Sequence, residues 1–167
     1  MHNPSVTVAI SALNEEANIK KFLESLLSQK EDGFHIEKIL IISDGSTDRT
    51  VELAASVNSE KIEVREYSER KGKSFRINEI NAGLTSDILV QFDADVVLEH
   101  DYVIHDLIQP FIRDENVGMC GGNPLPFKPV TFTEKAIACS LDSYLPLRSL
   151  LKNGNNIYSA LGCMLAY

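Results

Sequence analysis

Short apolar runs alternate along the chain with stretches in which apolar side chains recur every three or four residues. The short runs are rich in β-branched residues and predict strands at residues 6–12, 36–43, 62–67, 88–95 and 117–122. The helical spacing between them predicts amphipathic helices over residues 19–27, 51–57, 75–84 and 104–112. Strands that alternate with helices form a mainly parallel sheet with right-handed crossovers, so we predict a three-layer α/β/α architecture.

The pattern changes after residue 122. Three prolines predict an extended loop or edge, and residues 133–151 predict a longer helix with mixed apolar faces. Such a helix is suited to lying on the sheet, facing a membrane or meeting a missing partner. Residues 157–167 are apolar and strand-like, and the sequence stops within them. Because natural domains seldom end inside a buried strand, we expect residues 1–167 to be one domain that is truncated at its C-terminus.

Composition and charge exclude several classes of protein. With 44% hydrophobic and 24% charged residues, the chain of 167 residues is typical of a soluble globular domain. A net charge of -8 without a basic stripe argues against nucleic-acid binding. No basic leader with a long apolar stretch and no membrane-length apolar run is present, so we predict neither export nor a membrane span for this segment. Three cysteines without metal-ligand spacing favour reduced thiols in the cytoplasm.

Two carboxylates, Asp93 and Asp95, follow the fourth apolar run directly. Carboxylates at the end of a buried strand need water, a cation or a basic partner, because an unpaired charge is expensive to bury. Both can reach one divalent cation only if the chain turns as it leaves the strand, since strict strand geometry would align both side chains on one face. The pair therefore predicts a metal site, and a solvated turn is the alternative.

Further polar residues follow the other strands. Asn14 and Glu15 come after the first, Asp44 after the second, and a basic loop with Lys73 after the third. In a parallel sheet these strand ends share one edge, where ligands of open α/β sheets bind. The chain carries no glycine-rich phosphate loop of either common type, so phosphates at this edge would be held by a metal and side chains.

The same residues also have structural interpretations. Asn14 is a plausible cap for the first helix, and Glu15 suits a helix N-terminus. Ser46 or Asp48 could cap the second helix, and the basic loop could simply be solvated.

Four motifs occur in a family order: Ala12-Leu13-Asn14-Glu15-Glu16, Ser43-Asp44-Gly45-Ser46-Thr47-Asp48, Gly72-Lys73 with Asn78, and Phe92-Asp93-Ala94-Asp95. The chain thereby resembles the N-terminal half of a family 2 glycosyltransferase of GT-A fold. The resemblance extends from Val6 to about Gly122. Each motif is weak alone, and the ordered combination is specific.

The resemblance implies a role for seven positions, one by one. It implies that Ala12, Leu13 and Glu15 border the nucleoside, that Asp44 accepts a hydrogen bond from the base, that Lys73 lies near the diphosphate, that Asp93 faces the ribose and sugar, and that Asp95 ligates Mg²⁺ or Mn²⁺. Ser11 and Leu13 stand where a typical member has proline and tyrosine, so aromatic stacking on the base is not implied.

The resemblance also implies a reaction. A hydroxyl of an acceptor saccharide, lipid or other compound would displace the nucleoside diphosphate of a UDP- or GDP-sugar at the anomeric carbon. We expect this displacement to invert the configuration of that carbon. The family's general base belongs to an acidic motif that we expect beyond Tyr167. We therefore expect this segment to bind nucleotide with metal and to turn over sugar poorly or not at all. The parent enzyme is expected in the cytoplasm, and the apolar 133–151 helix leaves open an anchor at the cytoplasmic membrane face.

Rival interpretations remain at this point. Asp93-Ala94-Asp95-Val96-Val97 also resembles the nucleophile motif of a haloacid dehalogenase-type phosphatase, although that motif normally opens the core and here follows three strand and helix units. A binding or scaffold domain without chemistry is the third hypothesis. His100 and His105 could complete a metal site, and we expect them to be surface residues beside a helix. Asp142 is the only internal substitute for the general base, and we expect it to face solvent from a helix.

Overall fold

A six-stranded sheet forms the centre of the computed structural model, which describes residues 3–123, 125, 128–154 and 162–167. Its spatial order is β3-β2-β1-β4-β6-β5. The strands are β1 (Ser5–Ala12), β2 (His35–Asp44), β3 (Ile62–Tyr67), β4 (Ile88–Asp93), β5 (Cys120–Gly121) and β6 (Met164–Ala166). The first four strands are parallel, whereas β6 runs antiparallel to both β4 and β5. The predicted mainly parallel α/β sheet is confirmed.

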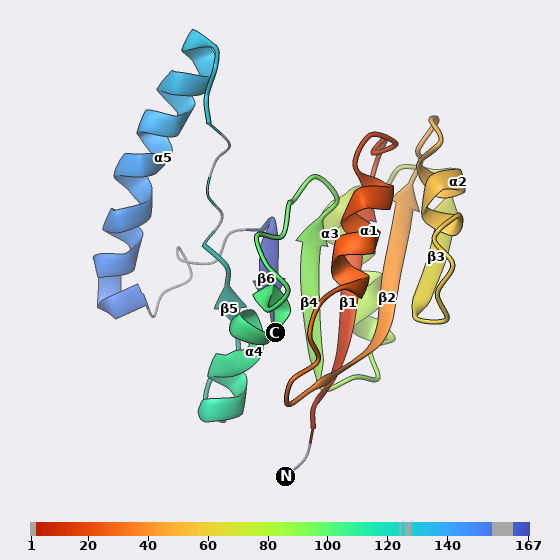
Figure 1. Ribbon diagram of the computed structural model, residues 1–167, viewed down its shortest axis with the longest axis horizontal. Helices are drawn as coiled ribbons and strands as arrows, with labels where there is room; N and C mark the ends of the chain where they lie inside the picture. Colours follow the sequence, from red (N-terminus) through yellow and green to blue (C-terminus); the bar gives the residue numbers. More distant parts are fainter. Residues whose placement is uncertain (1–2, 124, 126–127, 155–161) are drawn as a thin grey trace.

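Helices cover both faces of this sheet (Figure 1). They are α1 (Ile19–Leu27), α2 (Thr50–Ala55), α3 (Lys73–Ala82) and α4 (Val103–Arg113), and a further helix, α5 (Phe132–Leu150), is followed by a 3-10 turn at Leu151–Gly154. Apolar side chains of α1, α2 and α4 pack with Val8 and Ile10 on one face. Those of α3 pack with Ala9 on the other. Successive residues of β1 thus pack into the cores on opposite faces of the sheet, as expected of a strand that is buried on both faces. The sheet and the helices on its two faces are the three predicted layers.

Three predicted strands are shorter than expected. β4 ends at Asp93, because residues 94 and 95 form a turn. The predicted strand at residues 117–122 is reduced to Cys120–Gly121, which pairs only with β6 in the described part of the sheet. Beside it, a Cβ on Gly122 would lie 1.6 Å from the Met164 methyl carbon, so a larger residue there would require the flexible Met164 side chain to shift. The last strand begins at Met164, and residues 157–161 of the predicted 157–167 strand lie outside the described residues.

Helix α5 lies apart from the sheet (Figure 1). It begins at a capping box, in which Thr131 accepts from the Glu134 N–H and the Glu134 carboxylate accepts from the Thr131 N–H. Of its described side chains only Ala138 is buried, and Phe132 is 88% exposed. The side chain of Asp142 lies outside the described residues. Among the helices that the structure describes, none is long and apolar enough to cross a membrane.

The register of the parallel strands brings their carboxyl ends to one edge. Ser11 pairs with Asp93, Ala12 with Ser43, and Asp44 with Tyr67. The loops that follow β1, β2, β3 and β4 therefore leave the sheet side by side. This edge, which we call the carboxyl edge, is where the sequence places its candidate ligands.

Candidate functional site

Asp93 and Asp95 stand at the carboxyl edge on a turn. Asp93 is the last residue of β4, and the Val96 N–H donates to its carbonyl at 3.4 Å. Between the two acids, Ala94 is only 2% exposed and is part of the core, whereas Asp95 is exposed. The chain therefore turns as it leaves β4, as it must if both carboxylates are to reach one cation. Asp95 is accessible to a ligand from solvent.

Lys73 connects the basic loop to this acid pair. It is the first residue of α3, and its Nζ donates both to Asp93 Oδ1 and to the Gly162 carbonyl, the latter at 2.6 Å. Gln91 Nε2 donates to the same carbonyl at 3.2 Å, and the Asp93 N–H donates to the Cys163 carbonyl at 3.0 Å. The segment before β6 thus forms one wall of the site.

That wall was not predicted from the sequence. Gln91 does carry a signal, because it is a polar residue inside an otherwise apolar run and is only 5% exposed. A buried amide needs a hydrogen-bonding partner, and this one finds it in Gly162, which lies 71 residues further along the chain. Cys163 is half-buried beside the acids, and burial followed by the nearby Asp93 charge raises the pKa of its thiol.

Asp44 is also at the carboxyl edge, but this residue is only 4% exposed. It accepts from the Lys71 N–H at 3.0 Å, from the Gly72 N–H at 2.6 Å and from Arg76 Nε at 2.7 Å. Burial alone would raise the pKa of this carboxyl, but the hydrogen bonds from Lys71, Arg76 and Gly72 outweigh it and lower the pKa. Asp44 is therefore a charged group that fixes the basic loop to the end of β2.

Arg76 is the partner that sequence reasoning missed. The residue is 1% exposed, and besides Asp44 its side chain donates from Nη1 to Glu79 and from Nη2 to the Glu69 carbonyl, both at 2.8 Å. Its guanidinium carbon lies 3.7 Å from the centroid of the Tyr67 ring. Burial would lower the pKa of Arg76, but the acceptors Glu79 and Asp44 raise it. The sequence signal that could have indicated this role is the position of Arg76 next to Ile77, on the side of α3 that is buried.

The loop after β1 is held by the loop after β2. Asn14 adopts a left-handed backbone with φ of 57°. Its Oδ1 accepts from the Thr47 N–H at 2.8 Å, and its own N–H donates to Ser46 Oγ at 3.1 Å. The hypothesis that Asn14 caps α1 is therefore wrong, because its side chain bonds across to the neighbouring loop and the N-cap position is Asn18.

Glu15 contributes to the start of α1 through its backbone and its side chain. Its carbonyl accepts from the Ile19 N–H at 2.9 Å, and its Oε2 accepts from Asn18 Nδ2 at 2.9 Å. Ala12 is the buried last residue of β1, and Leu13 is half-buried on the loop that follows. Of the three positions that the resemblance places at the nucleoside, Ala12 therefore ends β1, and Leu13 and Glu15 lie on the loop after it.

Asp48 has a structural role in this second loop. It accepts from the Glu16 N–H and from the Thr50 N–H, both at 3.0 Å, while Glu16 accepts from the Arg49 N–H at 3.1 Å. The N-cap residue of α2 is Arg49, so neither Ser46 nor Asp48 occupies the cap position. These acids join two loops, which distinguishes them from the exposed Asp95.

His100 and His105 lie away from the acid pair. The His100 carbonyl accepts from Gln29, which lies just beyond the end of α1. His100 is therefore at the opposite edge of the sheet, where the parallel strands begin, which we call the amino edge. His105 Nδ1 bonds with Asp106 at 2.9 Å. Within the described residues no group of three or more His, Cys, Asp and Glu side chains is arranged to hold a metal ion. The two histidines therefore do not complete a site with Asp93 and Asp95.

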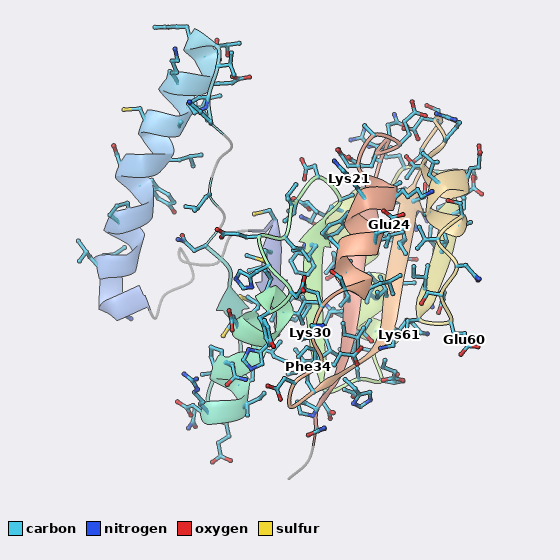
Figure 2. The ribbon with its side chains drawn as sticks, viewed as in Figure 1. Lys21, Glu24, Lys30, Phe34, Glu60 and Lys61 are labelled. Carbon is cyan, nitrogen blue, oxygen red and sulfur yellow. The ribbon has the colours of Figure 1, made fainter. Side chains whose placement is uncertain are left out.

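A hollow of about 330 Å³ also lies at the amino edge. It has an apolar floor that includes Leu26 and Ile39, and Lys61 and Glu31 form an ion pair beside it. Figure 2 shows Lys61 and Glu60 at this end of the molecule, where the strands begin. The hollow is thus at the edge opposite to Asp93 and Asp95 and has no part in the candidate site.

Comparison with known proteins gives one family and several related sequences. The sequence profile of "Glycosyl transferase family 2" matches residues 7–166. The chain is 32% identical over 130 residues to 4,4'-diaponeurosporenoate glycosyltransferase of Staphylococcus haemolyticus, covering 75% of this chain and 34% of the relative. It is 28% identical over 168 residues to glucosyl-3-phosphoglycerate synthase of Mycobacterium tuberculosis, covering 96% and 50%. The chain thus spans half or less of the length of these relatives.

Solved structures share the fold. A mannosyltransferase from Pyrobaculum calidifontis, in complex with GDP-Man and Mn²⁺, matches with a TM-score of 0.69 and 18% identity, covering all of this chain and 45% of that one. Glucosyl-3-phosphoglycerate synthase from Mycobacterium tuberculosis, in complex with Mn²⁺, UDP-glucose and phosphoglyceric acid, matches with a TM-score of 0.69 and 20% identity, covering 98% and 56%. The predicted GT-A fold is confirmed.

Proposed function

Because the chain belongs to glycosyl transferase family 2, we propose that its carboxyl edge binds a nucleotide diphosphate sugar with a divalent cation, within an enzyme that transfers the sugar to an acceptor hydroxyl. One observation carries the proposal: at the ends of parallel strands the half-buried Asp93 bonds the Lys73 ammonium group, and Asp95 is accessible two residues further along the chain. Ligands of open α/β sheets bind at this edge.

The residues present fit a hard divalent cation. Asp95 offers an exposed carboxylate, and Asp93 adds a second one across a single turn. Carboxylate oxygens are preferred ligands of Mg²⁺ and Mn²⁺. Asp95 would hold the ion, with Asp93 beside it on the ribose and sugar side. The ion, when bound, would neutralise charge on the departing diphosphate.

The remaining residues would bind and orient the donor. Lys73 lies close enough to the acid pair to bond Asp93, so its ammonium group would meet the diphosphate there. Ala12 at the end of β1, with Leu13 and Glu15 on the loop after it, would border the nucleoside, and the Asn14 hydrogen bonds fix this loop in place. We propose that Asp44 lies on the base side of the donor, where its carboxylate, bonded to Gly72 and Arg76, fixes the basic loop.

We propose an inverting displacement at the anomeric carbon, with a general base from a part of the enzyme outside residues 1–167. The relatives' names differ in the compound that receives the sugar, so the acceptor class is left as saccharide, lipid or another hydroxyl compound. We also propose that the reaction takes place in the cytoplasm or at the cytoplasmic face of the membrane.

Calorimetry tests the donor proposal directly. The 167-residue chain is titrated with UDP and with GDP, each with and without Mn²⁺. We expect one nucleotide to bind in a manner that requires the metal. Folded protein that binds neither nucleotide would contradict the proposal.

The two rival hypotheses give different outcomes. A haloacid dehalogenase-type phosphatase would hydrolyse a generic aryl phosphate, and the family match is to a transferase family instead. A domain without chemistry would bind nucleotide and metal and, when assayed as the full-length protein, still release no sugar from any nucleotide sugar.

A further inference from the structure

We propose that Arg76 is a positioning residue of the donor site, acting through Asp44 and the loop at residues 69–72 to hold Lys73 where a diphosphate would be bound. This inference rests on the proposed function. It assigns a role in donor binding to a side chain that lies beneath the carboxyl edge and would not itself touch the donor.

The contacts of Arg76 span the whole loop. Its Nη2 holds the Glu69 carbonyl at the beginning of the loop, and its Nε holds the Asp44 carboxylate, which in turn accepts from the Lys71 and Gly72 N–H groups at the end. A planar guanidinium group can donate in several fixed directions at once, which a lysine ammonium group at the same place cannot reproduce.

The loop has few other described anchors. Lys71 is exposed, and its Nζ lies 3.7 Å from a Glu69 carboxylate oxygen and 4.9 Å from the Phe75 ring centroid. Gly72 adopts φ of 90°, and a Cβ built on it would meet nothing within 4 Å. The loop conformation therefore depends on hydrogen bonds to its backbone, and those come from Asp44 and Arg76.

Lys73 is placed by the end of this loop. It follows Gly72 directly and opens α3, and the Arg76 N–H donates to the Gly72 carbonyl at 3.2 Å. A loosened Gly72 would let the Lys73 backbone move, and its Nζ would lose the position from which it reaches Asp93 and Gly162. A plain structural ion pair would instead affect stability without any specific effect on Lys73.

The test uses Arg76→Lys, with Arg65→Lys as the matched control. Arg65 forms an ion pair with Glu63 on β3 and is partly exposed. We measure trypsin cleavage after Arg70 and Lys71 in protein that melts cooperatively, together with the affinity for UDP and GDP with Mn²⁺. For Arg76→Lys we expect about fivefold faster cleavage and about tenfold weaker nucleotide binding, a factor of ten being the effect of one displaced charged contact. The control is expected to change neither.

A double-variant cycle separates positioning from stability. If Arg76 acts through Lys73, the substitution Arg76→Lys weakens nucleotide binding less than about twofold in a Lys73→Ala background. An equal loss in both backgrounds would overturn the proposal, as would unchanged cleavage in folded Arg76→Lys protein.

Two further outcomes are decided in the same experiment. If the unmodified chain binds neither nucleotide, the proposed function fails. The hold of Arg76 on the loop at residues 69–72 is then judged by the cleavage rate alone.

If Arg76→Lys does not melt cooperatively, Glu79→Gln replaces it, because this change weakens the acceptor of Nη1 and leaves the Asp44 pair intact. We then expect about twofold faster cleavage of the loop from a weakened hydrogen bond, and an unchanged rate would overturn the proposal that Arg76 holds the loop.

Discussion

Two strands of this sheet end in aspartate, and the two ends have opposite surroundings. Asp44 at the end of β2 is 4% exposed and accepts hydrogen bonds from three residues. Asp95, just beyond β4, is exposed on a turn. The difference arises because the loop after β3 bonds to Asp44 at the end of β2, whereas residues 94 and 95 form a turn on which Asp95 is exposed. The same motif, an apolar run followed by an acid, thus yields a structural charge in one place and an accessible ligand in the other.

We expect the largest effect when the buried ion pair of Asp44 and Arg76 is broken. Asp44→Ala leaves Arg76 buried without its Asp44 partner, and removal of one member of a buried ion pair typically costs about 3 to 5 kcal/mol. Urea unfolding measures this loss. Asp32→Ala, at an exposed acid, serves as the control, and a loss for Asp44→Ala as small as the control's would contradict the structural role of Asp44.

Lys73→Ala should affect binding more than folding. Its ammonium group is partly exposed, so we expect little change in stability, and we expect about tenfold weaker UDP or GDP binding with Mn²⁺ from the loss of one charged contact. Lys71→Ala removes the same charge from the neighbouring exposed side chain and is the control. Equal losses in the two variants would show a general effect of charge.

Asn14 tests how firmly the loop after β1 is held. Asn14→Ala removes the hydrogen bond to Thr47 and places alanine in a left-handed conformation, so we expect a loss of about 1 to 2 kcal/mol in unfolding free energy. Asn14→Gly removes the same hydrogen bond without the backbone penalty and should lose less. If both variants unfold at the same urea concentration, the left-handed backbone has no measurable effect.

We expect the smallest effect when the pH is lowered and the free energy of unfolding is measured. The pKa of Asp44 is lowered in the folded chain, so its contribution to stability is complete above the ordinary carboxyl pKa of about 3.9 and is lost as the pH falls through the lower folded value. Only the beginning of this loss is measurable before other carboxylates titrate. The unfolding free energy of the unmodified chain should therefore fall more between pH 5 and pH 3, as an approximate window, than that of Asp44→Asn. Parallel curves would contradict a lowered pKa.

Most of the sheet and its carboxyl edge could be predicted from periodicity. The strand at residues 62–67 and the helix at 19–27 match β3 and α1, because apolar spacing there agrees with the faces that are buried. The position of Asp44, Lys73 and Asp93 on one edge follows from the parallel topology alone.

The sequence could not predict contacts between distant loops. Asn14 looks like a helix cap, and its partner is Thr47, 33 residues away. Arg76 looks like a surface charge until the ring of Tyr67 and the carboxylate of Asp44 close around it. Local patterns specify elements, but hydrogen bonds that depend on how the elements pack together appear only in three dimensions.

The central claim is that Asp95 supports metal-dependent nucleotide binding, and calorimetry with Asp95→Asn tests it most directly. Glu99→Gln is the control, because it removes the same charge from an exposed acid four residues away. With Mn²⁺ present, we expect Asp95→Asn to weaken UDP or GDP binding about 100-fold, roughly 2.7 kcal/mol, while Glu99→Gln stays within about twofold. Unchanged, metal-dependent binding by folded Asp95→Asn protein would contradict the account.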